Sequence, residues 1–183
     1  MPEMPRTTVD TLSRGELNDV LISGVTLLFA DLVASGAALG WVDPPPKLEI
    51  ADLITQLVSE SALANSSARA ATVVARTESG GVVGIAYWRR YARPTHRVHA
   101  DIERLAVARE WQGQGIGARL LAACIETARS AGVEQLTLDS RGDNATAIRL
   151  WESSGFEEYG RLTDFVAVGT ARYDKTFWVL DLR

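Results

Sequence analysis

The seven residues from Gln112 to Ala118 restrict the possible folds of this chain more than any other segment does. They read Gln-Gly-Gln-Gly-Ile-Gly-Ala and lie between a strand-like stretch over 98–107 and a helix-like stretch. Apolar residues of the second stretch recur at helical spacing: Ile116, Leu120, Leu121, Cys124 and Ala128. Glycines at such a junction let a ligand approach the backbone closely, and free N–H groups at a helix start bind anions such as pyrophosphate. This segment, the glycine loop, therefore predicts a strand–loop–helix unit with an anion site.

Two kinds of nucleotide site with similar loops do not fit this spacing. A P-loop ends in Gly-Lys-Ser or Gly-Lys-Thr, which the glycine loop lacks. A dinucleotide-binding fold carries its glycines after the first strand, whereas here a hairpin pattern over 70–91 precedes the strand over 98–107. A glycine-rich turn that binds no ligand stays open as the alternative.

The periodicity of the apolar residues predicts the elements on both sides of the glycine loop. Helices are expected over 14–34, 47–64, 115–131 and 145–154, and a capping-box pattern of Ser13 and Glu16 marks the first start. Strands are expected over 7–12, 70–76, 82–91, 98–107, 135–139, 156–168 and 176–182. Strands that alternate with helices indicate a mixed α/β sheet. We expect one domain over residues 1–183, with disorder confined to residues 1–6.

Composition and charge exclude several classes of function. Hydrophobic residues make up 46% of the chain and charged residues 23%, as in ordinary globular proteins. A net charge of −4 leaves no basic surface for nucleic acid. The single cysteine allows no intrachain disulfide, and neither a secretion signal nor a membrane-spanning stretch is evident. No cluster of cysteine and histidine indicates a metal site. We expect a cytoplasmic protein that binds neither nucleic acid nor membranes.

Three motifs in the right order resemble the GCN5-related N-acetyltransferase (GNAT) superfamily. The glycine loop matches the family's Gln/Arg-x-x-Gly-x-Gly/Ala motif, and the strand-like run Ile102 to Val107 precedes it as in the family. The segment Asn144 to Phe156 is similar to the family's Asn-x-x-Ala-x-x-Leu-Tyr-x-x-x-Gly-Phe motif. The start of the chain is similar, over fewer residues, to the tabtoxin-resistance type of acetyltransferase. The resemblance implies an α/β GNAT fold: a mixed, mostly antiparallel sheet of six to seven strands with about four helices.

The resemblance also implies acetyl-CoA as the acetyl donor and places it. The strands over 98–107 and 135–139 splay apart to admit it. The backbone of Leu105, Ala106 and Val107 pairs with the pantetheine arm, and a backbone N–H near Ala106 or Val107 serves as oxyanion donor. Asn144 also binds the pantetheine, while Ala147 and Trp151 line its sulfur end. The backbone N–H groups of the glycine loop hold the pyrophosphate: Gln112, Gly113, Gln114, Gly115, Ile116, Gly117 and Ala118.

Acetyl transfer requires a neutral amine, and an alkyl amine is protonated at pH 7, so a base is needed. Glu103 stands where many GNAT members carry a catalytic glutamate, and strand alternation places it on the face of Asp101 and Leu105. If Glu103 is the base, Glu103→Gln should lower turnover by about 10²- to 10⁴-fold. The alternative is a surface glutamate paired with Arg104 or Arg97.

Asp139 is the second candidate for the base. It ends the strand over 135–139, and strand ends at a sheet opening are common ligand positions. The alternative is an aspartate that caps the turn before Gly142.

Trp151 departs from the family pattern, because most members carry a tyrosine there that protonates the departing thiolate. An indole donates a hydrogen bond but no usable proton. Tyr159, Tyr173 or a water would then supply the proton, or CoA would leave as a thiolate.

Residues that bind the acetyl acceptor are less marked in the sequence. Trp41 and Asp43, on the loop between the first two helices, are candidates because substrates of the family enter on that side. The leading hypothesis is an N-acetyltransferase that acts by direct transfer on a primary amine of a small molecule, such as an antibiotic, toxin or amino acid. The alternatives are a transferase for a protein N-terminus or lysine, and a non-catalytic acyl-CoA sensor. A homodimer through the C-terminal strands is compatible with each of these three functions.

Overall fold

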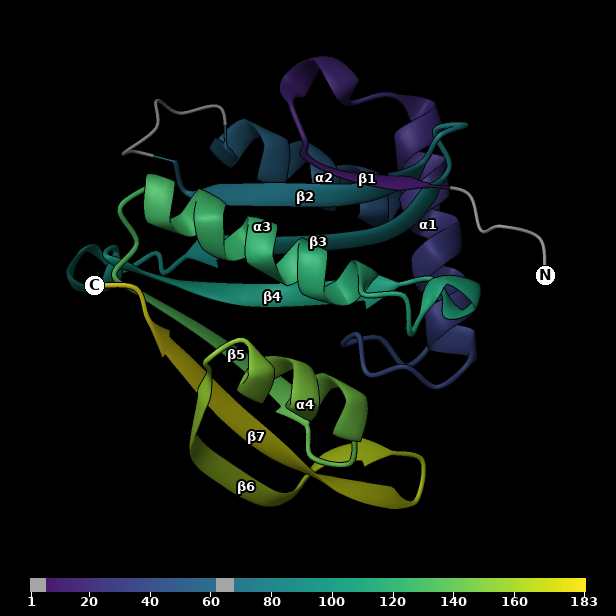
Figure 1. Ribbon diagram of the computed structural model, residues 1–183. Helices are drawn as coiled ribbons and strands as arrows, with labels where there is room; N and C mark the ends of the chain where they lie inside the picture. Colours follow the sequence, from purple (N-terminus) through teal and green to yellow (C-terminus); the bar gives the residue numbers. More distant parts are fainter. Residues whose placement is uncertain (1–5, 62–67) are drawn as a thin grey trace.

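A computed structural model describes residues 6–61 and 68–183 of this chain and contains one mixed sheet of seven strands (Figure 1). The strand order is β1-β2-β3-β4-β5-β7-β6, and only the β4–β5 pair is parallel. The predicted fold is therefore confirmed. The strands are β1 (Thr7–Thr11), β2 (Ala70–Thr77), β3 (Val82–Arg90), β4 (His99–Val107), β5 (Gln135–Arg141), β6 (Glu157–Val168) and β7 (Ala171–Asp181).

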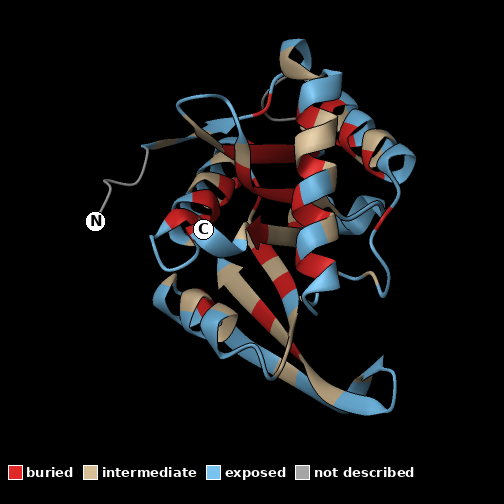
Figure 2. Ribbon diagram, turned by 90° about the vertical axis from the view of Figure 1, so that its right-hand side faces the viewer, coloured by how far each residue is buried: buried red, intermediate tan, exposed pale blue. Residues whose placement is uncertain are grey.

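Four α-helices cover the two faces of the sheet unequally. They are α1 (Asp19–Ala34), α2 (Lys47–Ser61), α3 (Ile116–Ser130) and α4 (Ala145–Ser153). Helices α1 and α2 lie behind β2–β4 in Figure 1, whereas α3 and α4 lie in front of the sheet. Each face has its own apolar core, and strand β6 is largely exposed (Figure 2). The face that carries α1 and α2, the α1/α2 face, is left open beside β5 and β7.

Strands β4 and β5 form a fork, as the family resemblance implied. They pair only from His99 with Gln135 to Asp101 with Thr137, and then diverge (Figure 1). Beyond Asp101, β4 continues to pair with β3 on one edge, whereas no strand of residues 6–61 and 68–183 pairs with its other edge. The closed end of the fork therefore lies at Asp101, and its open end lies where the glycine loop follows Val107.

Some predicted boundaries are wrong. The helix predicted over 14–34 consists of a short 3-10 turn, Arg14–Glu16, and of α1, which begins only at Asp19. The Glu16 carboxylate accepts the N–H of Ser13 (2.9 Å), so the capping box closes the short turn. Asn18 starts the real helix, since its Oδ1 accepts the N–H of Leu21 at 2.9 Å.

Strand β7 begins earlier than predicted, at Ala171 rather than Thr176. Gly169 adopts φ +56°, which permits a two-residue turn, so that Val168 pairs directly with Ala171. The disorder predicted for residues 1–6 falls almost wholly on residues outside the described part, as does the end of the second predicted helix. Across 6–61 and 68–183, no helix is both long and apolar enough to span a membrane.

Candidate active site

The glycine loop presents free backbone donors to open space. Gly113 and Gly115 both have φ +75°, a conformation that favours glycine, and a Cβ at either position would meet no atom within 4 Å. Gly115 caps α3 without a side-chain hydrogen bond. The backbone N–H groups of residues 113–118 have no hydrogen-bond acceptor within 6–61 and 68–183. The N–H of Gln112, expected to join them, instead donates to the Arg109 carbonyl at 3.2 Å.

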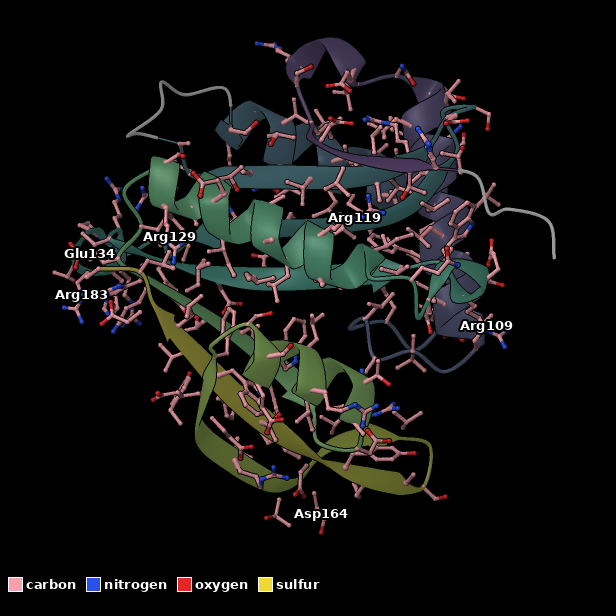
Figure 3. The ribbon with its side chains drawn as sticks, in the orientation of Figure 1. Arg109, Arg119, Arg129, Glu134, Asp164 and Arg183 are labelled. Atoms are coloured by element: carbon pink, nitrogen blue, oxygen red, sulfur yellow. The ribbon has the colours of Figure 1, made fainter. Side chains whose placement is uncertain are left out.

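Two arginines, Arg109 and Arg119, border the glycine loop in the sequence. Arg109 lies at the end of the molecule where α3 begins, and Arg129 lies at the opposite end of that helix (Figure 3). Arg119 is in the first turn of α3 and binds Thr7. The positive end of the α3 dipole makes this junction a good position for an anion.

The side chain of Gln112 ties the glycine loop to the open end of the fork. Its Nε2 donates to the carbonyl of Val107 at 2.9 Å. Between this contact and Asp101, one backbone edge of β4 has no partner strand within the described parts of the chain. An unpaired strand edge can bind an extended ligand that carries amide groups, as an added strand would. The geometry thus joins an anion site to a groove for an extended chain.

A β-bulge at Glu103 changes which side chains share a face. Tyr87 of β3 pairs with Arg104 and Trp88 pairs with Ile102, so Glu103 is the extra residue of β4. The prediction that Glu103 and Leu105 lie on the same face of the sheet is therefore wrong. The Leu105 side chain lies on the α3 face, 3.7 Å from the position of a Cβ on Gly117. Bulges re-aim side chains and are common beside active sites.

Three carboxylates, the carboxylate cluster, gather on the α1/α2 face at the closed end of the fork: Asp101, Glu103 and Asp139. Glu103 forms an ion pair with Arg89 (3.3 Å), not with Arg104 or Arg97. Asp139 forms one with Lys175 (3.0 Å) and is exposed. Asp101 has no ion pair among the residues that the structure describes.

Asp101 is the member of the cluster with the most perturbed protonation. Burial raises the pKa of its carboxyl to about 6; a hydrogen bond from Thr137 opposes this shift, and the charges of Asp139 and Glu103 add to it. The Thr137 hydroxyl lies 2.6 Å from the carboxylate and 2.6 Å from the Tyr91 hydroxyl. Half-exposed Tyr91 thus connects Asp101 to the surface through two hydrogen bonds.

Helix α4 places Asn144 and Trp151 on the opposite face of the sheet. The Oδ1 of Asn144 accepts the N–H of Ala147 at 3.2 Å, so the residue caps α4 and keeps its NH₂ group for another partner. Trp151 is buried, and its ring meets Phe156 edge-on at 6.3 Å. Its indole N–H is buried without a hydrogen-bond acceptor in 6–61 and 68–183. Such an orphaned donor is typical of a position that a ligand completes.

The loop over residues 35–46, the α1–α2 loop, is fastened to β4 by Arg104. The guanidinium donates from Nε to the Leu39 carbonyl (2.9 Å) and from Nη1 to the Tyr87 hydroxyl, and it lies 4.1 Å from the Trp41 ring centroid. The Trp41 indole donates to Glu49 at 2.7 Å.

The two residues predicted to contact the acetyl acceptor therefore differ in their surroundings. Trp41 packs on Arg104 and on Phe29, whose ring centroid lies 5.3 Å away, so it holds the α1–α2 loop in place. Asp43 is exposed on the same loop.

We expect Arg104→Met to destabilise the protein by roughly 2 kcal/mol, because hydrogen bonds of a charged donor are lost and the Tyr87 hydroxyl stays buried. Urea unfolding would measure this. Arg172→Met is the matched control, since the hydrogen bonds of Arg172 within 6–61 and 68–183 go to the carbonyls of Gly169 and Ala171 in an exposed turn. That variant should change stability by less than about 0.5 kcal/mol. Equal effects of both changes would contradict the role of Arg104.

Sequence reasoning missed the functional potential of Asp101 and Thr137. A signal was present: Asp101 and Glu103 alternate in β4, and Thr137 and Asp139 alternate in β5, so two polar pairs flank the fork. The bulge and the ion pairs with Arg89 and Lys175, by contrast, depend on strand register and left no local pattern.

Comparisons with known proteins agree with this geometry. The L-methionine sulfoximine/L-methionine sulfone acetyltransferase of Pseudomonas paraeruginosa is 27% identical over 164 residues, 88% of this chain and 89% of that protein. A phosphinothricin acetyltransferase from Sinorhizobium meliloti, solved in complex with AcCoA, superposes with a TM-score of 0.82 at 22% identity, covering 96% of this chain and 88% of that one.

Other relatives match over shorter stretches. The mycothiol acetyltransferase of Propionibacterium freudenreichii is 31% identical over 104 residues, 57% of this chain and 33% of that protein. This chain spans between 33% and 62% of the length of the first three curated relatives that it matches. A family model matches residues 36–156, which include the α1–α2 loop, the fork, the glycine loop and α4. The chain therefore belongs to the acetyltransferase (GNAT) family.

Proposed function

We propose that this protein is an acetyl-CoA-dependent N-acetyltransferase that acts on a primary amine of a small molecule by direct transfer. The observation that carries the proposal is the joint geometry of the fork: free N–H donors of the glycine loop at its open end and the carboxylate cluster at its closed end. One end suits pyrophosphate and the other suits proton transfer from an amine. A cytoplasmic location is part of the proposal.

The residues along the fork fit acetyl-CoA. Glycine-loop donors would bind its pyrophosphate, and the free edge of Leu105–Val107 would pair with the pantetheine amides. The NH₂ group of Asn144 is available to a pantetheine carbonyl. The orphaned N–H of Trp151 would gain an acceptor at the sulfur end. When bound, the thioester supplies the activated acetyl group.

The chain's own residues would then handle the protons and the developing charge. A backbone N–H near Ala106 or Val107 would stabilise the oxyanion. The carboxylate cluster would take the proton of the acceptor amine, with Glu103 and Asp139 as the members proposed from sequence. Tyr159 is exposed on the same face and is a candidate for protonating the thiolate, whereas Tyr173 stacks under Arg141 at 4.5 Å.

Names of relatives support an amino-acid-like acceptor, since two of them act on L-methionine sulfoximine or phosphinothricin. A protein N-terminus is the second candidate. The [ribosomal protein bS18]-alanine N-acetyltransferase of Escherichia coli is 42% identical over 59 residues, 32% of this chain.

Exposed apolar side chains of β6, Tyr159, Leu162, Phe165 and Val168, support a homodimer through the C-terminal strands as a further proposal.

Acetyl-CoA should stabilise the fold. At about 100 times its dissociation constant a ligand adds roughly 2.7 kcal/mol, which raises the melting temperature of a domain of this size by roughly 5–10 °C. A thermal melt with acetyl-CoA, NADH and ATP measures this. Equal shifts with all three ligands, or none, would contradict the proposal.

Thiol release from acetyl-CoA tests the reaction. The panel holds L-methionine sulfoximine, phosphinothricin, a peptide with N-terminal alanine and a lysine peptide. Turnover of the amino-acid analogues alone supports the small-molecule function, and turnover of the peptides alone supports the alternative. Binding of acetyl-CoA without turnover of any amine would favour the non-catalytic sensor.

A further inference from the structure

Within the described parts of the chain, one member of the carboxylate cluster forms no ion pair, and that member is not the glutamate indicated by the family pattern. We propose that Asp101 is the general base that takes the proton from the acceptor amine, directly or through one water, while Glu103 and Asp139 stay paired with Arg89 and Lys175 beside it. This inference rests on the proposed acetyl transfer and names the residue that makes the amine reactive.

The two other carboxylates form ion pairs with basic side chains. Arg89 lies 3.3 Å from Glu103 and also 3.0 Å from Glu60 of α2, so Glu103 belongs to a three-residue ion network. Lys175 lies 3.0 Å from Asp139. Glu103 and Asp139 are thus each held by a cation at ion-pair distance. Asp101 has no such partner among the residues that the structure describes.

Asp101 also has the right position along the fork. It is the last residue of β4 that pairs with β5, so its side chain lies where the fork closes. A ligand with its pyrophosphate at the glycine loop and its chain along Leu105–Val107 would bring its far end here. The distance along β4 from Val107 to Asp101 is roughly 20 Å at about 3.3 Å per residue. Trp151 lies on the opposite face, so the thioester would lie between an indole and a carboxylate.

The groups around Asp101 set its proton affinity in opposing directions. Glu103 on the same strand and Asp139 on β5 disfavour its negative charge, whereas Thr137 on β5 and Lys175 on β7 favour it. Tyr159 on β6 and the Tyr91 hydroxyl also face it.

Arg89 is the cross-strand partner of Asp101 on β3, but its guanidinium is bound to Glu60 and Glu103. The net result, chiefly from burial, is a pKa of about 6 for Asp101. Such a base is ionised at pH 7 and yet accepts a proton readily.

The Asp101 carboxylate takes one proton from the ammonium group, and the freed lone pair attacks the acetyl carbon. The new C–N bond forms, the C–S bond of the thioester breaks, and the amide nitrogen's surplus proton leaves with the thiol. The proton on Asp101 then reaches solvent, for which the hydrogen-bonded hydroxyls of Thr137 and Tyr91 offer a path.

The decisive experiment compares Asp101→Asn with Glu103→Gln in the same assay. The acceptor is L-methionine sulfoximine, or the panel amine that the wild type turns over fastest. We expect Asp101→Asn to lower kcat/KM by about 10²- to 10⁴-fold at pH 7.5 and to leave the melting shift with acetyl-CoA unchanged. Glu103→Gln should lower it far less. The reverse order of the two losses would overturn the proposal.

A pH profile provides a readout that does not require any change at Asp101. The wild-type kcat/KM should fall below pH 6, well separated from the amine, which titrates at about 8 or above. Thr137→Val removes a hydrogen bond to the charged form of Asp101. It should therefore move this acidic limb of the profile, the fall of kcat/KM, to higher pH. Asp139→Asn removes a negative neighbour and should move it to lower pH. If neither variant shifts the limb, Asp101 is not the titrating base.

Stability against pH checks the protonation of Asp101 independently of catalysis. Its pKa is raised in the folded state, so its charge destabilises the fold as the pH rises from about 4 to about 6. Asparagine cannot ionise. Asp101→Asn should therefore be more stable than the wild type at pH 8, and this gain should vanish at pH 4; an equal difference at both values would contradict the raised pKa.

The failure of this inference is distinguishable from the failure of the proposed function. If the wild type acetylates no amine, the function is wrong whatever Asp101 does. If the wild type acetylates an amine and Asp101→Asn, folded and bound to acetyl-CoA, keeps the full rate, only the assignment of the base is wrong.

Discussion

Gly115→Asp should abolish the thermal stabilisation of this protein by acetyl-CoA while the chain stays folded. Gly115 precedes the first turn of α3, and a Cβ there would project into space that no protein atom within 4 Å occupies. In the proposed complex that space holds the pyrophosphate. Two charges about 4 Å apart repel by about 4 kcal/mol at an effective dielectric constant of 20, which corresponds to about a 10³-fold loss of affinity.

Matched variants separate charge, size and backbone strain in this test. Gly115→Asn adds the same volume without charge, and asparagine tolerates φ +75° as well as aspartate does. It should lose less affinity than Gly115→Asp. Gly80→Asp places the same residue at another glycine with positive φ and open space, in the turn between β2 and β3. It should leave the melting shift intact; loss of the shift in both aspartate variants would show a general effect of strain.

Much of this fold could be predicted from local patterns. The glycine loop has a physical signature, because left-handed glycines at a helix start are needed whatever the rest of the chain does. The fork could not be derived from periodicity and entered through the family resemblance. Helix α1 shows the limit of local signals: Ser13 and Asn18 are both good caps five residues apart, and the pattern did not show that Asn18 begins the helix.

The candidate site could be predicted only in part, because its chemistry depends on register. Glu103 was proposed through the family resemblance, and Asp139 through its position at the end of a strand. The bulge that re-aims Glu103 arises between β3 and β4 and leaves no trace in the β4 sequence. The partners of these carboxylates, Arg89 and Lys175, come from strands β3 and β7, far away in the sequence. Which carboxylate of the cluster lacks an ion pair therefore depends on tertiary contacts.

Trp151→Ala should destabilise the protein strongly, because the side chain is buried to all but 6% of its surface. Truncation of a fully buried tryptophan costs about 3–5 kcal/mol through the cavity that it leaves, which lowers the melting temperature by on the order of 10 °C. Trp151→Phe should cost far less, since an aromatic ring remains and the lost N–H had no acceptor in 6–61 and 68–183.

Trp88 provides the matched control for the loss of the indole N–H in Trp151→Phe. Its indole N–H donates to Thr127 at 2.9 Å, and its ring is also buried. Trp88→Phe removes a similar volume and, in addition, a hydrogen bond worth about 0.5–1.5 kcal/mol. Urea unfolding should therefore rank Trp88→Phe below Trp151→Phe in stability. The opposite rank would indicate that the Trp151 N–H is bonded within the protein.

The same variants decide what Trp151 does in catalysis. An indole cannot protonate a thiolate, so we propose that Trp151 shapes the sulfur end of the site and excludes water. Trp151→Phe should then keep turnover within about tenfold, the loss expected for one hydrogen bond to the ligand. Trp151→Tyr restores the hydroxyl that most of the family carries, and faster turnover would show that the wild type lacks an acid. No gain would mean that another group protonates the thiolate or that product release limits the rate. The packing role is wrong if Trp151→Phe is as inactive as Trp151→Ala while both variants stay folded and bind acetyl-CoA normally.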